Sequence, residues 1–260
     1  MELTSKKIDI YYKIKNNFSS VNIDLKVENE KIILPSSIDY YLQGFYSFSD
    51  IAKLENIGLQ VKFNIENNNN FPKNTREITV ERIILYFLNK LLFLTNKEIA
   101  NIIKKSPISW EITPANIPQF SNFKDGTISL IKVLIKEEKG IDAKEVGTNL
   151  STVSKNDVAN RKYGENHGKL AAVLDIVYLE DKDYYLTILG KQISCIPEEL
   201  QEELFKKFIF NIPIIKKLIL ERAETKDVEI ILNRYLSEST AKRRASNIRT
   251  LLNMVMNKEN

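Results

Sequence analysis

The sequence predicts an α+β protein that is mostly helical, with a β-containing start, a middle unit of three helices and a β-hairpin, and a helical end. Three observations predict this fold class. Apolar and polar residues alternate with a period of two in parts of the first 75 residues. The apolar period becomes helical from Glu77 onward. Near residue 181, a charged turn separates two short apolar segments, which is typical of a hairpin.

Residues 1–75 are the predicted β-rich N-terminal region. Clean alternation is typical of a strand with one buried face, and Pro35 ends one of the apolar runs. The strands expected from these patterns are residues 8–14, 21–27, 31–35 and 59–65. A run of asparagines at residues 67–70, followed by Pro72, reads as a polar loop and marks the end of the region.

Residues 76–122 are expected to form a helical connector and are a first candidate helix-turn-helix. Thr95 and Glu98 have the spacing of a capping box, in which each side chain bonds the other residue's backbone N–H. They predict a short helix at residues 96–105. Prolines cannot continue a helix, and they exclude one through residues 107–120. These prolines are Pro107, Pro114 and Pro118.

Residues 123–195 contain the most informative pattern. Apolar spacing predicts a first helix at residues 128–135, and Asp142 is the expected N-cap of a short second helix. A polar segment rich in Ser and Asn spans residues 149–166, and residues 169–177 are interpreted as the apolar end of a third helix. A tight hairpin follows around residues 180–183. Three helices followed by a hairpin is the element order of a winged helix.

The end of this unit resembles winged-helix domains, in which a helix end, a wing and a Leu-Thr-x-x-Gly junction recur in this order. Here the junction is Leu186-Thr187-x-x-Gly190. The resemblance implies that the third helix enters the major groove of DNA. The candidate DNA-binding residues on or near that helix are Lys155, Asn160, Arg161, Lys162, Tyr163, Asn166, His167 and Lys169. The alternative interpretation is a solvated polar loop with no role in binding.

Side-chain chemistry assigns different roles to these candidates. Arg161 is suited to a bidentate contact with guanine, and Asn160 or Asn166 to one with adenine. The lysines would hold phosphates, which position the protein without reading sequence. Two glycines in the same segment, Gly164 and Gly168, would permit a close backbone approach.

Residues 196–260 are expected to be a helical region that ends in a second helix-turn-helix. Residues 228–236 predict a short helix, and residues 237–240 a turn rich in capping residues. The last helix has one apolar face, formed by Ala241, Ala245, Ile248, Leu252 and Val255. Its other side is basic. The candidate DNA contacts here are Ser239, Thr240, Lys242, Arg243, Arg244 and Asn247. The alternative is a basic surface helix that closes the domain.

Residues 160–256 resemble the winged-helix and helix-turn-helix module found in some bacterial restriction endonucleases and their associated recognition subunits. The most distinctive stretch is Ser-Thr-Ala-Lys-Arg-Arg-Ala-Ser at residues 239–246. The resemblance implies sequence-specific binding of double-stranded DNA within a restriction-modification or related defence system. It also implies a nuclease domain or subunit as a partner.

The composition of the chain excludes several other kinds of site and classes of enzyme. The chain has 260 residues, a net charge of +4, one cysteine and one histidine. These counts exclude an intramolecular disulfide, a Cys-rich zinc site and paired-histidine chemistry. No glycine motif of a Walker-type ATPase or a Rossmann enzyme is present. With no signal peptide and no apolar run long enough for a membrane span, we expect a cytoplasmic protein that has no membrane partner.

The sequence contains no convincing catalytic motif, and no cofactor is expected. A restriction-type nuclease needs acidic groups for Mg²⁺ and a nearby lysine. A crude match is Asp9, Asp24 and Lys26, and a weaker one is Glu180 with Lys182. Alternation of polar residues on strands explains the first match better than a nuclease site does. Cys195 lies in an apolar stretch and is interpreted as a core residue.

Three alternatives to a DNA-recognition subunit remain open from the sequence. The first is a replication initiator or transcriptional regulator built from tandem winged helices. The second is a small type II restriction endonuclease that uses Mg²⁺. The third is a protein-interaction module in which the winged helices act only as scaffolds.

Overall fold

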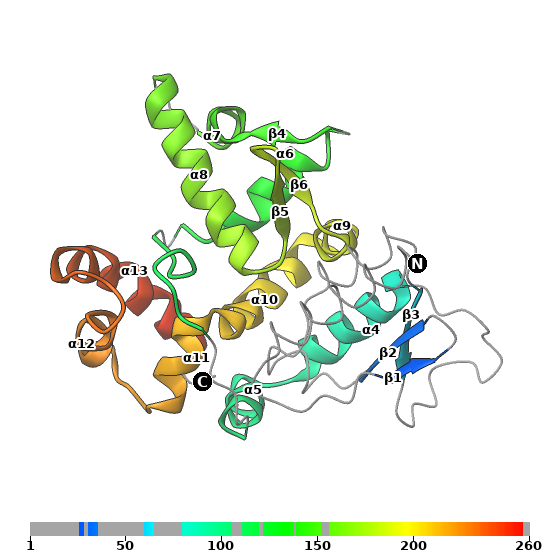
Figure 1. Ribbon diagram of the computed structural model, residues 1–260, viewed down its shortest axis with the longest axis horizontal. Helices are drawn as coiled ribbons and strands as arrows, with labels where there is room; N and C mark the ends of the chain where they lie inside the picture. The colour runs from blue at the N-terminus through cyan, green and yellow to red at the C-terminus, as the bar shows by residue number, and fades with distance from the viewer. Residues whose placement is uncertain are drawn as a thin grey trace, which may run out of the picture.

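The computed structural model describes residues 26–28, 31–35, 60–64, 80–105, 111–119, 122–137, 139–151 and 156–256. It is mostly helical and has short strands (Figure 1), as expected for an α+β protein. The helices are α4 (Val80–Phe93), α5 (Asn96–Lys104), the π-helix η1 (Asp125–Ser129), α6 (Leu130–Leu134), α7 (Ala143–Leu150), α8 (Asp157–Val173), α9 (Ile188–Ser194), α10 (Glu198–Phe208), η2 (Ile209–Asn211), α11 (Pro213–Leu220), η3 (Thr225–Asp227), α12 (Val228–Leu232) and α13 (Glu238–Met256). The strands are β1 (Lys26–Glu28), β2 (Lys31–Pro35), β3 (Gln60–Asn64), β4 (Ile141–Asp142), β5 (Val177–Glu180) and β6 (Asp183–Leu186).

The N-terminal strands form a small mixed sheet. β1 pairs antiparallel with β2, and β2 pairs parallel with β3, in a register that sets Ile32 opposite Val61. The strands predicted at residues 21–27, 31–35 and 59–65 therefore each overlap an observed strand. The strand predicted at residues 8–14 lies outside the described residues.

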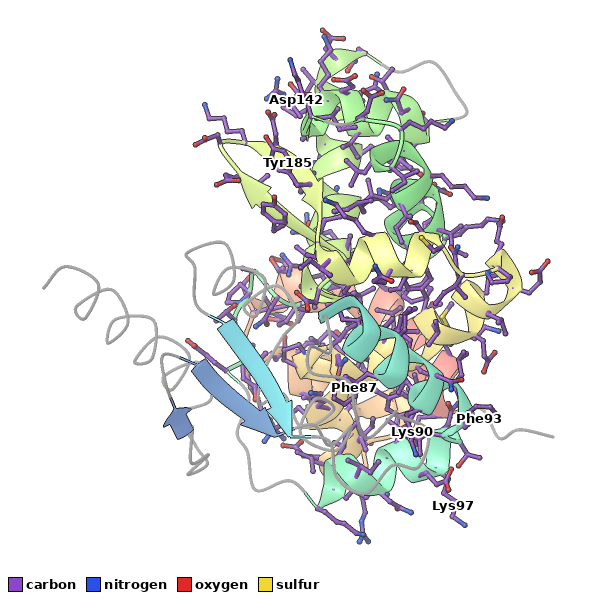
Figure 2. The ribbon with its side chains drawn as sticks, turned by 90° about the vertical axis from the view of Figure 1, so that its right-hand side faces the viewer. Phe87, Lys90, Phe93, Lys97, Asp142 and Tyr185 are labelled. Carbon is purple, nitrogen blue, oxygen red and sulfur yellow. The ribbon has the colours of Figure 1, made fainter. Side chains whose placement is uncertain are left out.

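The first helical pair, α4 and α5, is joined by the predicted capping box. The Thr95 hydroxyl accepts from the Glu98 amide at 3.2 Å, and the Glu98 carboxylate accepts from the Thr95 amide at 2.8 Å. At the end of α4, the ammonium of the buried Lys207 on α10 donates to the Leu92 carbonyl at 2.6 Å and to the Leu94 carbonyl. A cation at these carbonyls complements the negative end of the helix dipole. Phe93 lies at the surface end of the same helix (Figure 2).

The middle unit contains the expected helices and hairpin. Its three strands form an antiparallel sheet in the order β4-β6-β5. Asp142 caps α7 by accepting from the Glu145 amide at 2.8 Å, as predicted. The hairpin turns at Asp181 and Lys182, both of which have positive φ, the backbone conformation that a two-residue hairpin turn requires.

The third helix, α8, starts well before the apolar segment at residues 169–177 that was expected to end it, and it stops at Val173 because Val177 begins β5. α8 begins at Asp157, and the Asn156 side chain caps it by accepting from the Ala159 amide at 2.9 Å. The polar side chains of this helix gave it no apolar stripe from which its period could be read. The helix is held instead by the close packing of small residues against α7.

Two glycines set the distance between α7 and α8. A Cβ on Gly164 would lie 1.8 Å from the carbonyl oxygen of Ala143, and one on Gly147 would lie 1.8 Å from that of Asn160. A Cβ on Gly168 would lie 2.4 Å from the Tyr184 ring. The close backbone approach expected at Gly164 and Gly168 is therefore found, and it is made by other parts of this chain.

The Leu-Thr-x-x-Gly junction has a direct structural explanation. The buried Thr187 hydroxyl donates to the Asp175 carbonyl at 2.7 Å and accepts from the Gly190 amide at 3.0 Å, which caps α9. A Cβ on Gly190 would lie 2.4 Å from the Ile176 carbonyl oxygen. The threonine and the glycine together tie the end of β6 to the turn that follows α8.

The C-terminal region ends as predicted, in two helices separated by a turn. α12 is shorter than expected and ends at Leu232, and α13 buries the predicted face. That face consists of Ala241, Ala245, Ile248, Leu252 and Val255. Buried apolar residues form one cluster that runs from Ile84 on α4 to Val255 on α13. Cys195, expected in the core, is exposed, because it follows α9 two residues beyond the buried Ile193.

None of the helices in the described ranges is both long and apolar enough to cross a membrane.

Candidate nucleic-acid interface

α8 presents a basic stripe on its outer side. Figure 1 shows α8 running from the upper left of the molecule toward its centre, above α12 and α13. Arg161, Lys162 and Lys169 are exposed, and no ion-pair partner for any of them occurs among the described residues. Val158, on the first turn, is 78% exposed. Lys155 lies outside the described ranges.

Three of the sequence candidates on α8 face the protein instead. Asn160 and Asn166 are buried at 6% exposure, and His167 is fully buried. The His167 Nδ1 lies 2.8 Å from the Tyr163 carbonyl oxygen one turn earlier. The adenine contact proposed for Asn160 or Asn166 is inconsistent with this burial, because neither side chain reaches the helix surface.

Tyr163 anchors α8 to the start of the π-helix. Its hydroxyl donates to Asp125 at 2.6 Å and accepts from Asn122 at 3.4 Å. Burial, together with the Asp125 carboxylate, raises the pKa of Tyr163 to about 12. The ring also contacts His167, with centroids 4.2 Å apart. Tyr163 therefore serves to position α8 within the protein.

The β5–β6 hairpin carries acidic charge at its tip. Glu180, Asp181 and Asp183 surround the single base Lys182, and this charge disfavours the approach of a phosphate. On the hairpin's face, Tyr178 and Tyr185 stack with ring centroids 5.3 Å apart. Burial raises the pKa of Tyr178 above its ordinary value, with Glu180 adding to the effect.

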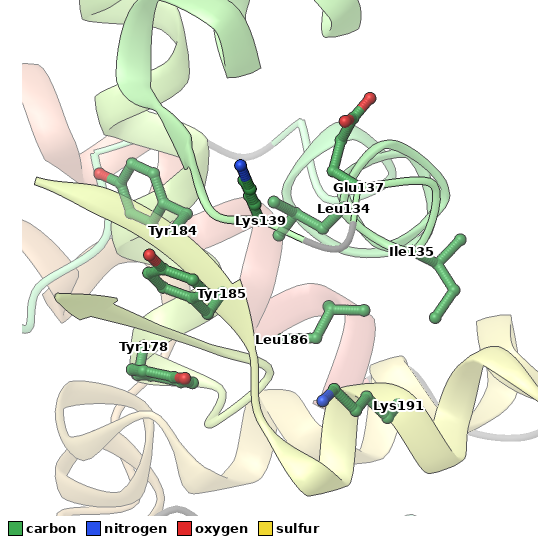
Figure 3. Close-up of a pocket in the computed structure, with 9 residues that line it drawn as sticks. All are labelled: Leu134, Ile135, Glu137, Lys139, Tyr178, Tyr184, Tyr185, Leu186 and Lys191. Carbon is green, nitrogen blue, oxygen red and sulfur yellow. The ribbon is translucent and has the colours of Figure 1, made fainter.

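A groove of about 330 Å³ lies between the hairpin, the end of α6 and α9 (Figure 3). Its lining mixes aliphatic, aromatic and charged side chains: Leu134, Ile135, Glu137, Lys139, Tyr178, Tyr184, Tyr185, Leu186 and Lys191. Tyr185 and the α7 cap Asp142 both lie in this upper unit, away from α4 and α5 (Figure 2). Charges of both signs line the groove, so it has no clear preference for an anion.

α13 presents a second basic surface at its N-terminal half. Ser239, Lys242 and Arg243 are exposed, and Thr240 is half-buried, with its hydroxyl 3.0 Å from that of Ser237. Lys242 and Arg243 form no ion pair with any described residue. No acidic residue occurs in the helix after Glu238.

Other polar residues of α13 have structural partners. The Arg244 guanidinium, 8% exposed, donates to the carbonyls of Pro114 at 2.7 Å and Ile117 at 2.9 Å. The Asn247 amide donates to the Gln119 carbonyl. Together they hold residues 111–119 against the helix. The proposed base contacts of Arg244 and Asn247 are therefore inconsistent with the structure, because both side chains face inward.

The candidate nuclease residues do not assemble into a described site. Asp9 and Asp24 lie outside the described residues, Lys26 begins β1, and Glu180 and Lys182 occupy the hairpin tip. Among the residues that the structure describes, no group of three or more His, Cys, Asp or Glu side chains could hold a metal ion.

Comparison of the chain with protein families, with curated proteins and with solved structures finds no match.

Proposed function

We propose that this protein binds double-stranded DNA sequence-specifically, with residues 123–195 acting as a winged helix whose α8 enters the major groove. The observation that carries the proposal is the stripe of Arg161, Lys162 and Lys169, which is exposed and forms no ion pair with any described residue. One face of α8 is packed against α7 and the opposite face is basic, as a groove-binding helix requires. The sheet order β4-β6-β5 supports the winged-helix assignment.

The second helix-turn-helix adds a further contact. Lys242 and Arg243 follow the turn between α12 and α13, where a helix N-terminus also favours phosphate. In Figure 1, α8 lies above α13, and both run from the left side of the molecule toward its centre. Because the hairpin tip is acidic, the DNA phosphates repel it, and α8 and α13 supply the contacts with DNA.

The biological setting that we propose is a restriction-modification or related defence system, in which this chain recognises DNA beside a nuclease domain or subunit. This setting rests on the resemblance of residues 160–256 to recognition modules of bacterial restriction systems. Ser239 and Arg243, in its most distinctive stretch, are both exposed on α13.

Fluorescence anisotropy with labelled duplexes from a random pool tests the proposal, at low salt and with unlabelled random duplex as competitor. Arg161→Ala with Lys162→Ala should weaken binding by about tenfold or more, since each phosphate or base contact contributes ~1 kcal/mol or more. The matched control removes two exposed lysines of α5, Lys97→Ala with Lys104→Ala, and should bind like the unaltered protein. Failure to retain any duplex at low salt would refute the proposal.

The acidic hairpin favours a second candidate, a protein-interaction module. Its tip residues Glu180, Asp181 and Asp183 would suit a basic partner surface, and Leu179 beside them is exposed. The double change Lys242→Ala with Arg243→Ala distinguishes DNA binding from a protein-interaction function. That change should weaken DNA binding and should leave a hairpin-mediated protein contact intact.

A further inference from the structure

The first turn of α8 carries an exposed apolar side chain, one turn before the cations Arg161 and Lys162. Val158 is 78% exposed, although it is a β-branched aliphatic residue. It is the second residue of α8, and the Asn156 cap fixes the turn that holds it. An ion pair of 2.7 Å between Lys144 on α7 and Asp157 adds a second tie at the same point.

Helical spacing places Val158 on the basic stripe. Arg161 and Lys162 follow it by three and four residues, which puts them on the same face one turn later. Lys169 lies on that face two turns beyond them. Scattered apolar residues on a surface need no explanation. This one, however, occupies the turn of a groove-binding helix from which base edges are contacted.

The major groove of DNA offers one apolar feature, the 5-methyl group of thymine. A valine on the first turn, held by a capped backbone and flanked by cations that bind phosphate or guanine, is suited to bury that methyl group. We infer that Val158 is a specificity-determining residue that contacts a thymine methyl group in the recognised duplex. This inference rests on the proposed function, and it adds a thymine to the bases that α8 is proposed to recognise.

The test replaces thymine with deoxyuridine, which lacks only the methyl group. A bound duplex is first selected from a random pool, and each thymine near its centre is then changed singly to deoxyuridine. At one position or more, the change should weaken binding about fourfold, the effect of burying one methyl-sized group (about 0.8 kcal/mol). Val158→Ala should bind the thymine and deoxyuridine duplexes equally well.

A matched control is Leu200→Ala, which removes another exposed aliphatic side chain, from α10. It should keep the fourfold discrimination. Because Val158 is exposed, its alanine variant should keep the circular dichroism spectrum and melting temperature of the unaltered protein. The inference would be overturned, while DNA binding stands, by either of two results. One is that Val158→Ala still binds the thymine duplex more tightly than the deoxyuridine duplex. The other is that the unaltered protein shows no such preference at any thymine. The absence of binding to any duplex would overturn both proposals.

Discussion

The backbone contact at Gly164 is one of the two tightest single-residue constraints in the middle unit, together with that at Gly147. A Cβ on Gly164 would lie 1.8 Å from the Ala143 carbonyl oxygen, a distance that only a shift of α7 or α8 can relieve. Unlike a flexible side chain, a backbone oxygen inside a helix cannot rotate away. The close packing of these two helices therefore depends on the absence of a side chain at this position.

Gly164→Ala should lower the free energy of unfolding by about 3 kcal/mol or more, at the upper end of the cost of overpacking. Urea denaturation followed by circular dichroism measures the change. Lys169→Ala, an exposed substitution in the same helix, should leave the midpoint nearly unchanged. A Gly164→Ala protein as stable as the unaltered one would show that the helices can move apart at no cost.

The buried Lys216 on α11 predicts how stability depends on pH. Burial lowers the pKa of Lys216 from 10.5 to about 7. Between these two values the unfolded chain binds a proton that the folded protein has released, so stability rises with pH. The slope is at most about 1.4 kcal/mol per pH unit.

Lys216→Met should remove this rise and should stabilise the protein most at pH 7 and below, where the folded protein otherwise holds a buried charge. Denaturation curves at several pH values between 6 and about 10 measure the effect. Lys217→Met, in which the neighbouring half-buried lysine is replaced, should keep the rise. An unchanged pH profile in Lys216→Met would contradict the assignment.

At the level of single elements, two adjacent arginines of α13 have different roles, one in holding the fold together and one at the surface. Arg244 fastens the helix to residues 111–119 through two carbonyls, whereas Arg243 faces solvent. Residues 111–119 connect α5 to the π-helix region, so this attachment sets where the middle unit begins relative to α13.

The adjacent pair gives a test of that division. Arg244→Ala should lower the free energy of unfolding by about 2–4 kcal/mol, because charge-assisted hydrogen bonds are lost and carbonyls are left unsatisfied. Arg243→Ala should leave thermal stability unchanged and weaken DNA binding severalfold. Differential scanning fluorimetry and anisotropy measure the two effects. Equal destabilisation by both variants would contradict the division.

At the scale of the whole molecule, one continuous core joins the middle unit to the C-terminal helices. This connection holds α8 and α13 in a fixed relation, so the two helices are expected to contact a single duplex. Contacts to phosphate release counterions, and the salt dependence of binding counts those contacts.

If Lys162, Lys169, Lys242 and Arg243 each hold a phosphate, the logarithm of the binding constant should fall with the logarithm of salt concentration with a slope of about −3.5. Lys242→Ala with Arg243→Ala should reduce that slope to about −2. Anisotropy titrations at several salt concentrations measure both slopes. A slope unaffected by the double change would show that α13 does not contact the duplex.

Local patterns were sufficient for most elements. The capping box at Thr95, the N-cap at Asp142, the alternating strands and the charged hairpin turn each involve residues within a few positions of one another, so their geometry is encoded locally. The apolar face of α13 was likewise predicted by its spacing. The start of α8 has no such local signal, because its polar residues form no apolar stripe.

Local sequence patterns predict the mostly helical α+β fold class, the order of helices and hairpin, and the presence of two basic segments. Which basic and polar residues face solvent follows from the packing of the folded chain. Asn160, Asn166, His167 and Arg244 are buried, whereas Arg161 and Arg243 are exposed. The physical reason is that burial depends on partners far along the chain. The carbonyls that hold Arg244 lie 127 and 130 residues away, and no local pattern encodes them.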